Sequence, residues 1–225
     1  MTTSATLHIT VVSDVVCPWC FIGQRHLRVA LSEWARLYPQ RTAPEIEWSA
    51  FQLNPDMPLN GVDREAYVRQ KFGTRYDEIM ARMADAGTRA GIAFDWTRVV
   101  RQPNTLPLHG LILGAEGLRQ QSAIAERLFE AFFLDGVDVT DQNAVAAAVA
   151  PLGVGAQQVA ACWDRDGDHQ RRAAEVDQQW RRNGIQGVPL FVFNRKWAVS
   201  GAQPPDQLVK AMEHAFDDAQ VSAPT

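Results

Sequence analysis

The chain has few of the features that mark membrane or nucleic-acid-binding proteins. No apolar run approaches the ~20 residues that a membrane-spanning helix needs. The formal net charge is −4, so the chain lacks the basic excess typical of proteins that bind nucleic acid. The first ten residues contain no basic segment followed by an apolar one, which predicts a cytoplasmic location. We therefore expect neither a membrane nor a nucleic acid as partner.

Cysteine is also scarce, with only Cys17, Cys20 and Cys162 in 225 residues. Three is an odd number and too few for a disulfide scaffold, so a close pair in such a chain is more often catalytic or metal-binding. A structural zinc site needs four ligands, and the five histidines form no second pair at ligand spacing. We expect no metal, and we expect Cys162, beside Val159 and Trp163, to be an inert buried thiol.

The cysteine pair lies where a strand is expected to lead into a helix. Residues 7–16 are rich in β-branched side chains and predict a buried strand. Pro18 then takes the first helical position, where its missing N–H costs nothing. Apolar residues follow at helical spacing until Tyr38 and Pro39 end the pattern. Cys17 is therefore expected at the N-terminus of a helix, with Cys20 one turn further on.

The remaining chain predicts a second strand, a helical block and a hairpin. Residues 45–53 indicate a strand, and the proline-containing residues 54–61 a linker. Two apolar runs at 190–193 and 197–200 flank an Asn-Arg-Lys turn, which is typical of a hairpin. A last helix is expected over residues 204–219. Between linker and hairpin, a 3.6-residue period predicts helices over 64–90, 107–120, 123–134, 142–152, 156–164 and 168–182.

A thiol pair in this position suits thiol–disulfide exchange. The thiolate is the nucleophile, and the unpaired N–H groups and dipole of a helix N-terminus favour a negative charge there. Cys17 is therefore the expected nucleophile. Cys20, one turn on and more buried, is the expected resolving thiol. Pro18 and Trp19, between the two cysteines, are expected to tune the stability of the thiolate.

The motifs "DVVCPWCFIGQRHL", "FQLNPDMP", "KFG", "GIAF", "NTLPLH", "GVPLFVFN" and "VSGAQ" occur in this order along the chain. Together they resemble the thioredoxin superfamily, specifically the FrnE-like subgroup of the DsbA-family oxidoreductases. The resemblance implies an α/β thioredoxin fold with a large all-α insertion. It places residues 1–60 and 180–220 in a discontinuous thioredoxin-like domain and residues 61–179 in the inserted helical domain.

The resemblance also implies roles for residues outside the cysteine pair. The Val188-Pro189 bond would be cis and lie beside the pair, so that Val188 and Pro189, with Pro18 and Trp19, contact substrate. Trp19 would be exposed at the rim of the site. Three further residues have a possible supporting role: Asp14, His109 and Gln203.

Each supporting residue also has a simpler explanation. Asp14 is expected to be either a buried proton acceptor for Cys20 or a turn residue. His109 would either line the cleft or, the reading we favour, serve as a structural histidine. Gln203 would lie in a loop near the active site, although turn chemistry alone explains its neighbours.

Three functions remain open on the sequence. The first is a dithiol–disulfide oxidoreductase that needs no cofactor, has glutathione as a candidate redox partner, and acts on a disulfide- or thiol-containing protein or small molecule. The second is a glutathione-dependent transferase or isomerase of the kappa-class or hydroxychromene-carboxylate isomerase type. By resemblance, those enzymes usually carry serine at the position of Cys17, so the intact pair favours the first. The third is a peptide-binding chaperone. The sequence sets no expectation for the oligomeric state.

Overall fold

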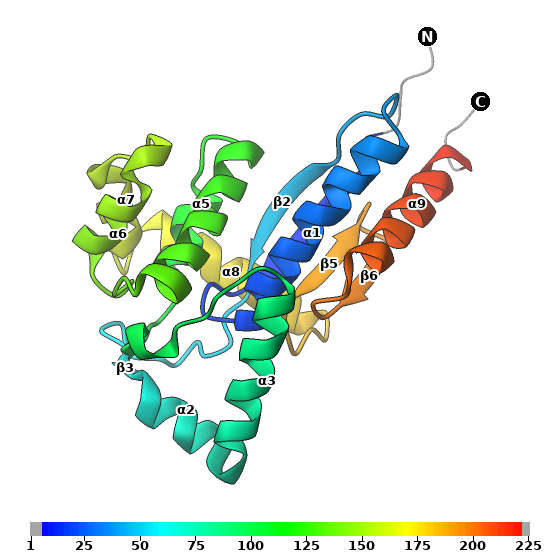
Figure 1. Cartoon of the computed structure of the whole chain (residues 1–225). Coiled ribbons are helices and arrows are strands. Elements are labelled where there is room, and N and C mark those ends of the chain that lie inside the picture. The colour runs from blue at the N-terminus through cyan, green and yellow to red at the C-terminus, as the bar shows by residue number, and fades with distance from the viewer. Residues whose placement is uncertain (1–5, 222–225) are drawn as a thin grey trace.

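A four-stranded sheet lies at the centre of the structure, a computed structural model that describes residues 6–221 (Figure 1). The strands are β1 (His8–Ser13), β2 (Glu45–Ala50), β5 (Leu190–Phe193) and β6 (Trp197–Ser200), in the spatial order β2-β1-β5-β6. Strand β1 is parallel to β2 and antiparallel to β5, which is in turn antiparallel to β6. The chain therefore needs a crossover between β1 and β2, which helix α1 (Pro18–Leu37) supplies.

Alternation along β1 directs neighbouring side chains to opposite faces of the sheet. Val11 belongs to the main hydrophobic core, on the face where α1 and α9 (Pro205–Val221) run side by side (Figure 1). Val12 belongs to a smaller cluster that includes Trp180 of α8 (Asp168–Arg182). The Trp180 indole N–H also donates to the hydroxyl of Ser49 on β2, 2.8 Å away. Helices therefore cover both faces of the sheet.

The hairpin between β5 and β6 forms where the sequence predicts it. Asn194 and Arg195 both have positive φ, at 49° and 58°, and lie at the centre of a tight turn in which the Lys196 N–H donates to the carbonyl of Phe193. This backbone twist suits a hairpin connection. The Asn194 side chain accepts from the backbone N–H of His8 and donates to the carbonyl of Ala215. The turn is thereby joined to both β1 and α9.

The region between β2 and β5 is almost entirely helical. Its elements are α2 (Arg64–Phe72), η1 (Gly73–Arg75), α3 (Tyr76–Arg89), η2 (Trp96–Arg98), α4 (Leu106–Leu113), α5 (Leu118–Glu130), η3 (Ala131–Asp135), α6 (Gln142–Val149), η4 (Ala150–Leu152) and α7 (Ala156–Trp163), before α8. Two short strands, β3 (Val62–Asp63) and β4 (Arg101–Gln102), pair with each other and were not expected.

Two of the predicted helices are wrong as continuous segments. The segment 64–90 is interrupted at Gly73, whose φ of +53° is unfavourable for other residues. The segment 107–120 ends at Leu113 and restarts at Leu118, after Gly117 with a φ of +141°. Periodicity continues across such breaks because apolar residues on both sides face the same core.

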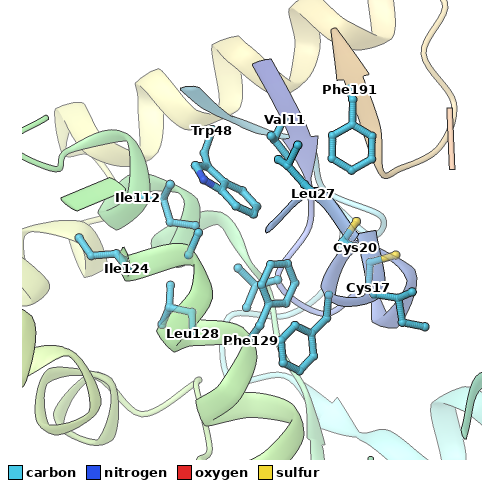
Figure 2. Close-up of a cluster of buried hydrophobic side chains, with 14 of the residues drawn as sticks. Val11, Cys17, Cys20, Leu27, Trp48, Ile112, Ile124, Leu128, Phe129 and Phe191 are labelled. Atoms are coloured by element: carbon cyan, nitrogen blue, oxygen red, sulfur yellow. The ribbon is translucent and has the colours of Figure 1, made fainter. Parts of the chain in front are cut away.

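The main core is continuous between the sheet and the helical region. The ring of Phe21 on α1 stacks on Phe129 of α5 at a centroid distance of 5.3 Å and on Phe133 at 5.9 Å. Figure 2 shows Cys17 and Cys20 at the edge of this same cluster. The predicted α/β fold with a large helical insertion is confirmed. The predicted boundary at residues 179 and 180 falls within α8, and the division into two domains stays a prediction.

Among residues 6–221, no helix combines the length and the apolar character that crossing a membrane requires.

Candidate active site

The cysteine pair lies at the junction between β1 and α1, as predicted. Cys17 is the N-cap of α1, with extended backbone angles of −89° and 112°, and Pro18 takes the first helical position. The backbone N–H of Cys17 donates to the carbonyl of Asp14, which closes the turn out of the strand. The first turn of α1 contains no acidic side chain, so nothing there opposes a negative charge on Cys17. Both cysteines are free thiols.

The loop before β5 reaches the same point from the far end of the chain. The Val188-Pro189 bond is cis, which confirms the prediction. The Cys17 Sγ lies 3.7 Å from the carbonyl oxygen of Val188, in hydrogen-bonding range for a thiol. The structure therefore brings together Cys17, Cys20, Pro18, Val188 and Pro189 in one place.

Gly23 allows this close approach, and the sequence analysis missed it. A Cβ added to Gly23 would lie 3.1 Å from Cγ of Pro189 and 3.1 Å from Cζ of Phe191. Glycine in the middle of a helix usually costs stability relative to alanine. Its presence one turn after Cys20 is the signal that could have pointed to a tight contact on this side of α1.

Cys20 is held in its protonated form. It is 2% exposed, and burial raises the pKa of its thiol well above the usual range, with the neighbouring Cys17 sulfur adding to the effect. Interactions with the Ser13 side chain and the Asp14 backbone lower that pKa in part. The two cysteines therefore differ in environment, although they lie in one helical turn. Cys17 lines an open cleft, and Cys20 does not.

Asp14 and His109 form a buried pair next to the cysteine loop. One carboxylate oxygen of Asp14 accepts from the backbone N–H of Leu53 at 2.7 Å, and the other lies 3.4 Å from Nε2 of His109. Oδ1 of Asp14 and Nε2 of His109 are both buried, and neither has a hydrogen bond of good geometry. The Asp14 carboxylate thus faces the loop after β2 and helix α4, while its backbone faces Cys20. His109 is 2% exposed, and it lies outside the cleft beside Cys17.

The loop after β2 is tied to the helical region by a second set of polar contacts. The Gln52 side-chain amide donates to Oδ1 of Asn104, and Nδ2 of Asn104 donates to the carbonyl of Met57. The Tyr67 hydroxyl donates to Oδ1 of Asn54 at 2.6 Å. These contacts hold Leu53 and Asn54 as one wall of the cleft.

A cleft of about 330 Å³ opens beside Cys17, between the start of α1 and helices α2 and α3. Trp19 lines it and is half-buried, so the expectation of an exposed rim residue is corrected. The indole packs against a cluster of Val68, Met80 and Met83, because α2 and α3 fold over the start of α1. The cleft thus has an apolar wall next to the Cys17 sulfur.

Cationic side chains that the sequence analysis did not single out also line the cleft. Arg64 and Lys71 on α2 line it together with Gln102 of β4, and no aspartate or glutamate does. Arg64 is only 6% exposed, and burial lowers the pKa of its guanidinium. A charged residue in a helical pattern is normally read as solvent-exposed, which is why the sequence carried no signal for Arg64.

Gln203 and Cys162 lie outside the cleft. The Gln203 backbone carbonyl accepts from Nδ1 of His26, 2.9 Å away, and its side-chain amide donates to the carbonyl of Ser200. Gln203 holds the turn between β6 and α9 against α1, which agrees with the turn explanation.

Cys162 is 1% exposed on α7, and burial raises the pKa of its thiol to about 11. Among residues 6–221, no three His, Cys, Asp or Glu side chains are arranged to hold a metal ion.

Comparison with known families places this site in context. The DsbA-like thioredoxin domain family matches residues 8–213, from the start of β1 into α9. The chain belongs to this family. A curated relative, the uncharacterised protein YwbO of Bacillus subtilis, is 25% identical over 214 residues, covering 92% of this chain and 96% of that protein.

Solved structures share the fold across nearly the whole chain. A probable DsbA oxidoreductase of Streptomyces coelicolor has a TM-score of 0.83 at 23% identity, covering 97% of this chain and 92% of its own. A 2-hydroxychromene-2-carboxylate isomerase gives 0.69 at 15% identity, covering 96% and 100%. The cytosolic disulfide reductase DsbM of Pseudomonas aeruginosa, also solved with glutathione, gives 0.59 at 17% identity in that complex, covering 95% and 98%. At these identities the likeness shows the fold alone.

Proposed function

We propose that this protein is a dithiol–disulfide oxidoreductase of the FrnE-like subgroup, with Cys17 as nucleophile and Cys20 as resolving thiol. The observation that carries the proposal is the placement of two free cysteines in the first turn of α1, with the Cys17 sulfur beside both the cis-proline loop and a cleft. Thiolates are favoured at helix N-termini, while the raised pKa of Cys20 keeps the second thiol unreactive until it is needed.

The exchange proceeds in two balanced steps. The Cys17 thiolate attacks one sulfur of a substrate disulfide, which forms a mixed disulfide and releases the other substrate sulfur as a thiolate. Cys20 then loses its proton and attacks the Cys17 sulfur, which forms the Cys17–Cys20 disulfide and releases the second substrate thiolate. Two electrons pass from the protein to the substrate, and the reverse sequence oxidises a dithiol.

The surrounding residues have supporting roles in this proposal. Pro18, Trp19, Val188 and Pro189 contact the substrate, with the Val188 backbone beside the reacting sulfur. The Asp14–His109 pair positions the loop that carries Cys17, through the contact of Asp14 with Leu53.

The proposal also covers partners and location. Glutathione is proposed as the redox partner and the cytoplasm as the location, with a thiol- or disulfide-containing molecule as substrate. DsbM, which shares this fold, is described as a cytosolic disulfide reductase and was solved with glutathione.

Replacing each cysteine separately tests the assignment. We expect Cys17→Ser to reduce disulfide exchange with insulin or glutathione disulfide to the uncatalysed rate. Cys20→Ser should form the mixed disulfide and then stop, because no neighbouring thiol can resolve it. Mass spectrometry of the intact protein detects that adduct. Full exchange activity in Cys17→Ser would rule out the proposal.

The isomerase neighbour favours one alternative, a glutathione-dependent transferase or isomerase. Such an enzyme would bind glutathione non-covalently and would not need a dithiol. The alternative therefore predicts glutathione-dependent activity that survives replacement of both Cys17 and Cys20 by serine. The oxidoreductase predicts that the double variant is inactive.

A further inference from the structure

Arg64 is a buried cation that has no anionic partner in the part of the chain the structure describes. It is 6% exposed, its Nε has no hydrogen-bond partner, and none of the ion pairs between residues 6 and 221 involves it. Its guanidinium lies over the Trp96 ring, with Cζ 4.9 Å from the ring centroid. A buried charge without a counterion is costly, and proteins rarely keep one unless it is paired.

The guanidinium also lines the cleft that contains Cys17. Lys71 lines the same cleft. Gln102, a residue that is 5% exposed, contributes a side-chain amide that has no hydrogen bond within the described chain. No carboxylate lines this cleft, so a bound anion would meet two cations and no repelling group. Guanidinium pairs with a planar carboxylate through two parallel hydrogen bonds.

The size of the cleft indicates a small molecule. Its volume of about 330 Å³ lies at the lower end of the range for pockets that hold small ligands, roughly 300–1,000 Å³. Trp19, Val68 and Phe72 line the same cleft and supply apolar surface beside the sulfur and the cations. A ligand that fits would carry a sulfur at one end, for Cys17, and a carboxylate at the other.

We propose that this cleft selects a small thiol or disulfide that bears a carboxylate, and that Arg64 binds the carboxylate while Cys17 exchanges with the sulfur. The inference rests on the proposed function and names its substrate class. Arg64 is a binding residue in this proposal. Its guanidinium has no counterion in the described chain, and the carboxylate of the ligand supplies one.

The test compares an acidic and a neutral disulfide on the reduced full-length protein. Glutathione disulfide carries carboxylates, and 2-hydroxyethyl disulfide does not. Exchange is followed as loss of protein thiols under second-order conditions. Arg64→Met should slow exchange with glutathione disulfide at least tenfold and leave exchange with 2-hydroxyethyl disulfide within twofold. A charge-assisted hydrogen bond is strong enough to account for a loss of this size.

Arg69→Met is the matched control, since Arg69 is on the same helix, exposed, paired with Glu65, and outside the cleft. It removes the same charge and should leave both rates within twofold. Arg64→Lys keeps the charge without the bidentate geometry and should give an intermediate loss with glutathione disulfide. This second variant decides the question if Arg64→Met does not fold.

Binding without redox chemistry separates this inference from the proposed function. S-methylglutathione should bind calorimetrically to Cys17→Ser, and binding should be lost when Arg64→Met is added. If the wild-type protein exchanges with neither disulfide, the proposed function fails, and this titration still decides the role of Arg64.

Three results would overturn the inference. One is equal slowing of both disulfides by Arg64→Met, which would indicate a structural role. Another is that Arg64→Met leaves both the rate with glutathione disulfide and the binding of S-methylglutathione unchanged. The third is that Arg64→Met loses activity only in the reduction of insulin, which would indicate that the substrate is a protein instead of a small acidic thiol.

Discussion

At the scale of single residues, the structure separates three thiols that the sequence presents as chemically alike. Cys17 caps a helix and lines a cleft, Cys20 lies beneath it in the core, and Cys162 is buried on α7. Burial raises the pKa of both Cys20 and Cys162, the latter to about 11. A raised pKa keeps a thiol protonated to higher pH, so the reactive form of each is scarce at neutral pH.

Alkylation of the reduced protein should therefore be selective for Cys17. We expect iodoacetamide at pH 7 to label Cys17 at least about tenfold faster than Cys20 or Cys162, because thiolate character and access control the rate. Peptide mass spectrometry at timed intervals measures the three rates. The Cys17→Ser protein is the control and should take up almost no label. Equal labelling of Cys162 at pH 7 would contradict its raised pKa.

At the scale of elements, the packing of α1 against the loop before β5 sets the geometry of the site. Gly23 lets Pro189 approach the helix, and the Cys17 sulfur then lies 3.7 Å from the Val188 carbonyl. A side chain at position 23 would have to displace Pro189 or Phe191, and both belong to the segment that closes the site.

Gly23→Val should lower both stability and exchange activity. Overpacking of this kind costs roughly 1–3 kcal/mol, and a 1 kcal/mol loss lowers the Tm of a protein of this size by about 2–4 °C. Ala35→Val, at an exposed position on the same helix, controls for the lower helix propensity of valine. Thermal unfolding and the exchange rate are the measurements. A Gly23→Val protein that matches Ala35→Val in both would show that the contact with Pro189 does not matter.

The sequence predicted the elements better than their ends. The strand–helix junction at Cys17 and the hairpin at Asn194 were predicted because a proline at the first helical position and a polar turn between apolar runs are local signals. The breaks at Gly73 and Gly117 were missed, since both sides of each break keep a helical pattern. Strands β3 and β4 have two residues each, too few to show alternation.

At the scale of the whole molecule, the sheet and the helical region share one core. Phe21 of α1 stacks on Phe129 and Phe133, so the apolar surface of each part is completed by the other. The predicted thioredoxin-like and inserted domains therefore have no separate cores on this side. We expect them to unfold together.

Phe129→Ala tests this coupling. Removing a buried aromatic ring should cost about 3–5 kcal/mol, and the loss should appear in a single transition. Circular dichroism reports the helices of both parts. Fluorescence reports the seven tryptophans, among them Trp34 and Trp48 in the core beside the sheet and Trp96 and Trp163 in the inserted segment. The two midpoints should fall together in Phe129→Ala as in the wild type. Two separated transitions would show that the inserted helices form an independent unit.

The sequence by itself determined that Cys17 stands at the start of a helix, because Cys17, Pro18 and the flanking apolar patterns act over a few residues. Only the tertiary structure decided what surrounds it. Val188 is 171 positions from Cys17 in the chain, and its carbonyl reaches the sulfur because β5 pairs with β1. Arg64 loses its solvent only when its helix folds over the start of α1. Burial and long-range contact depend on which segments pack together, and no local pattern records that.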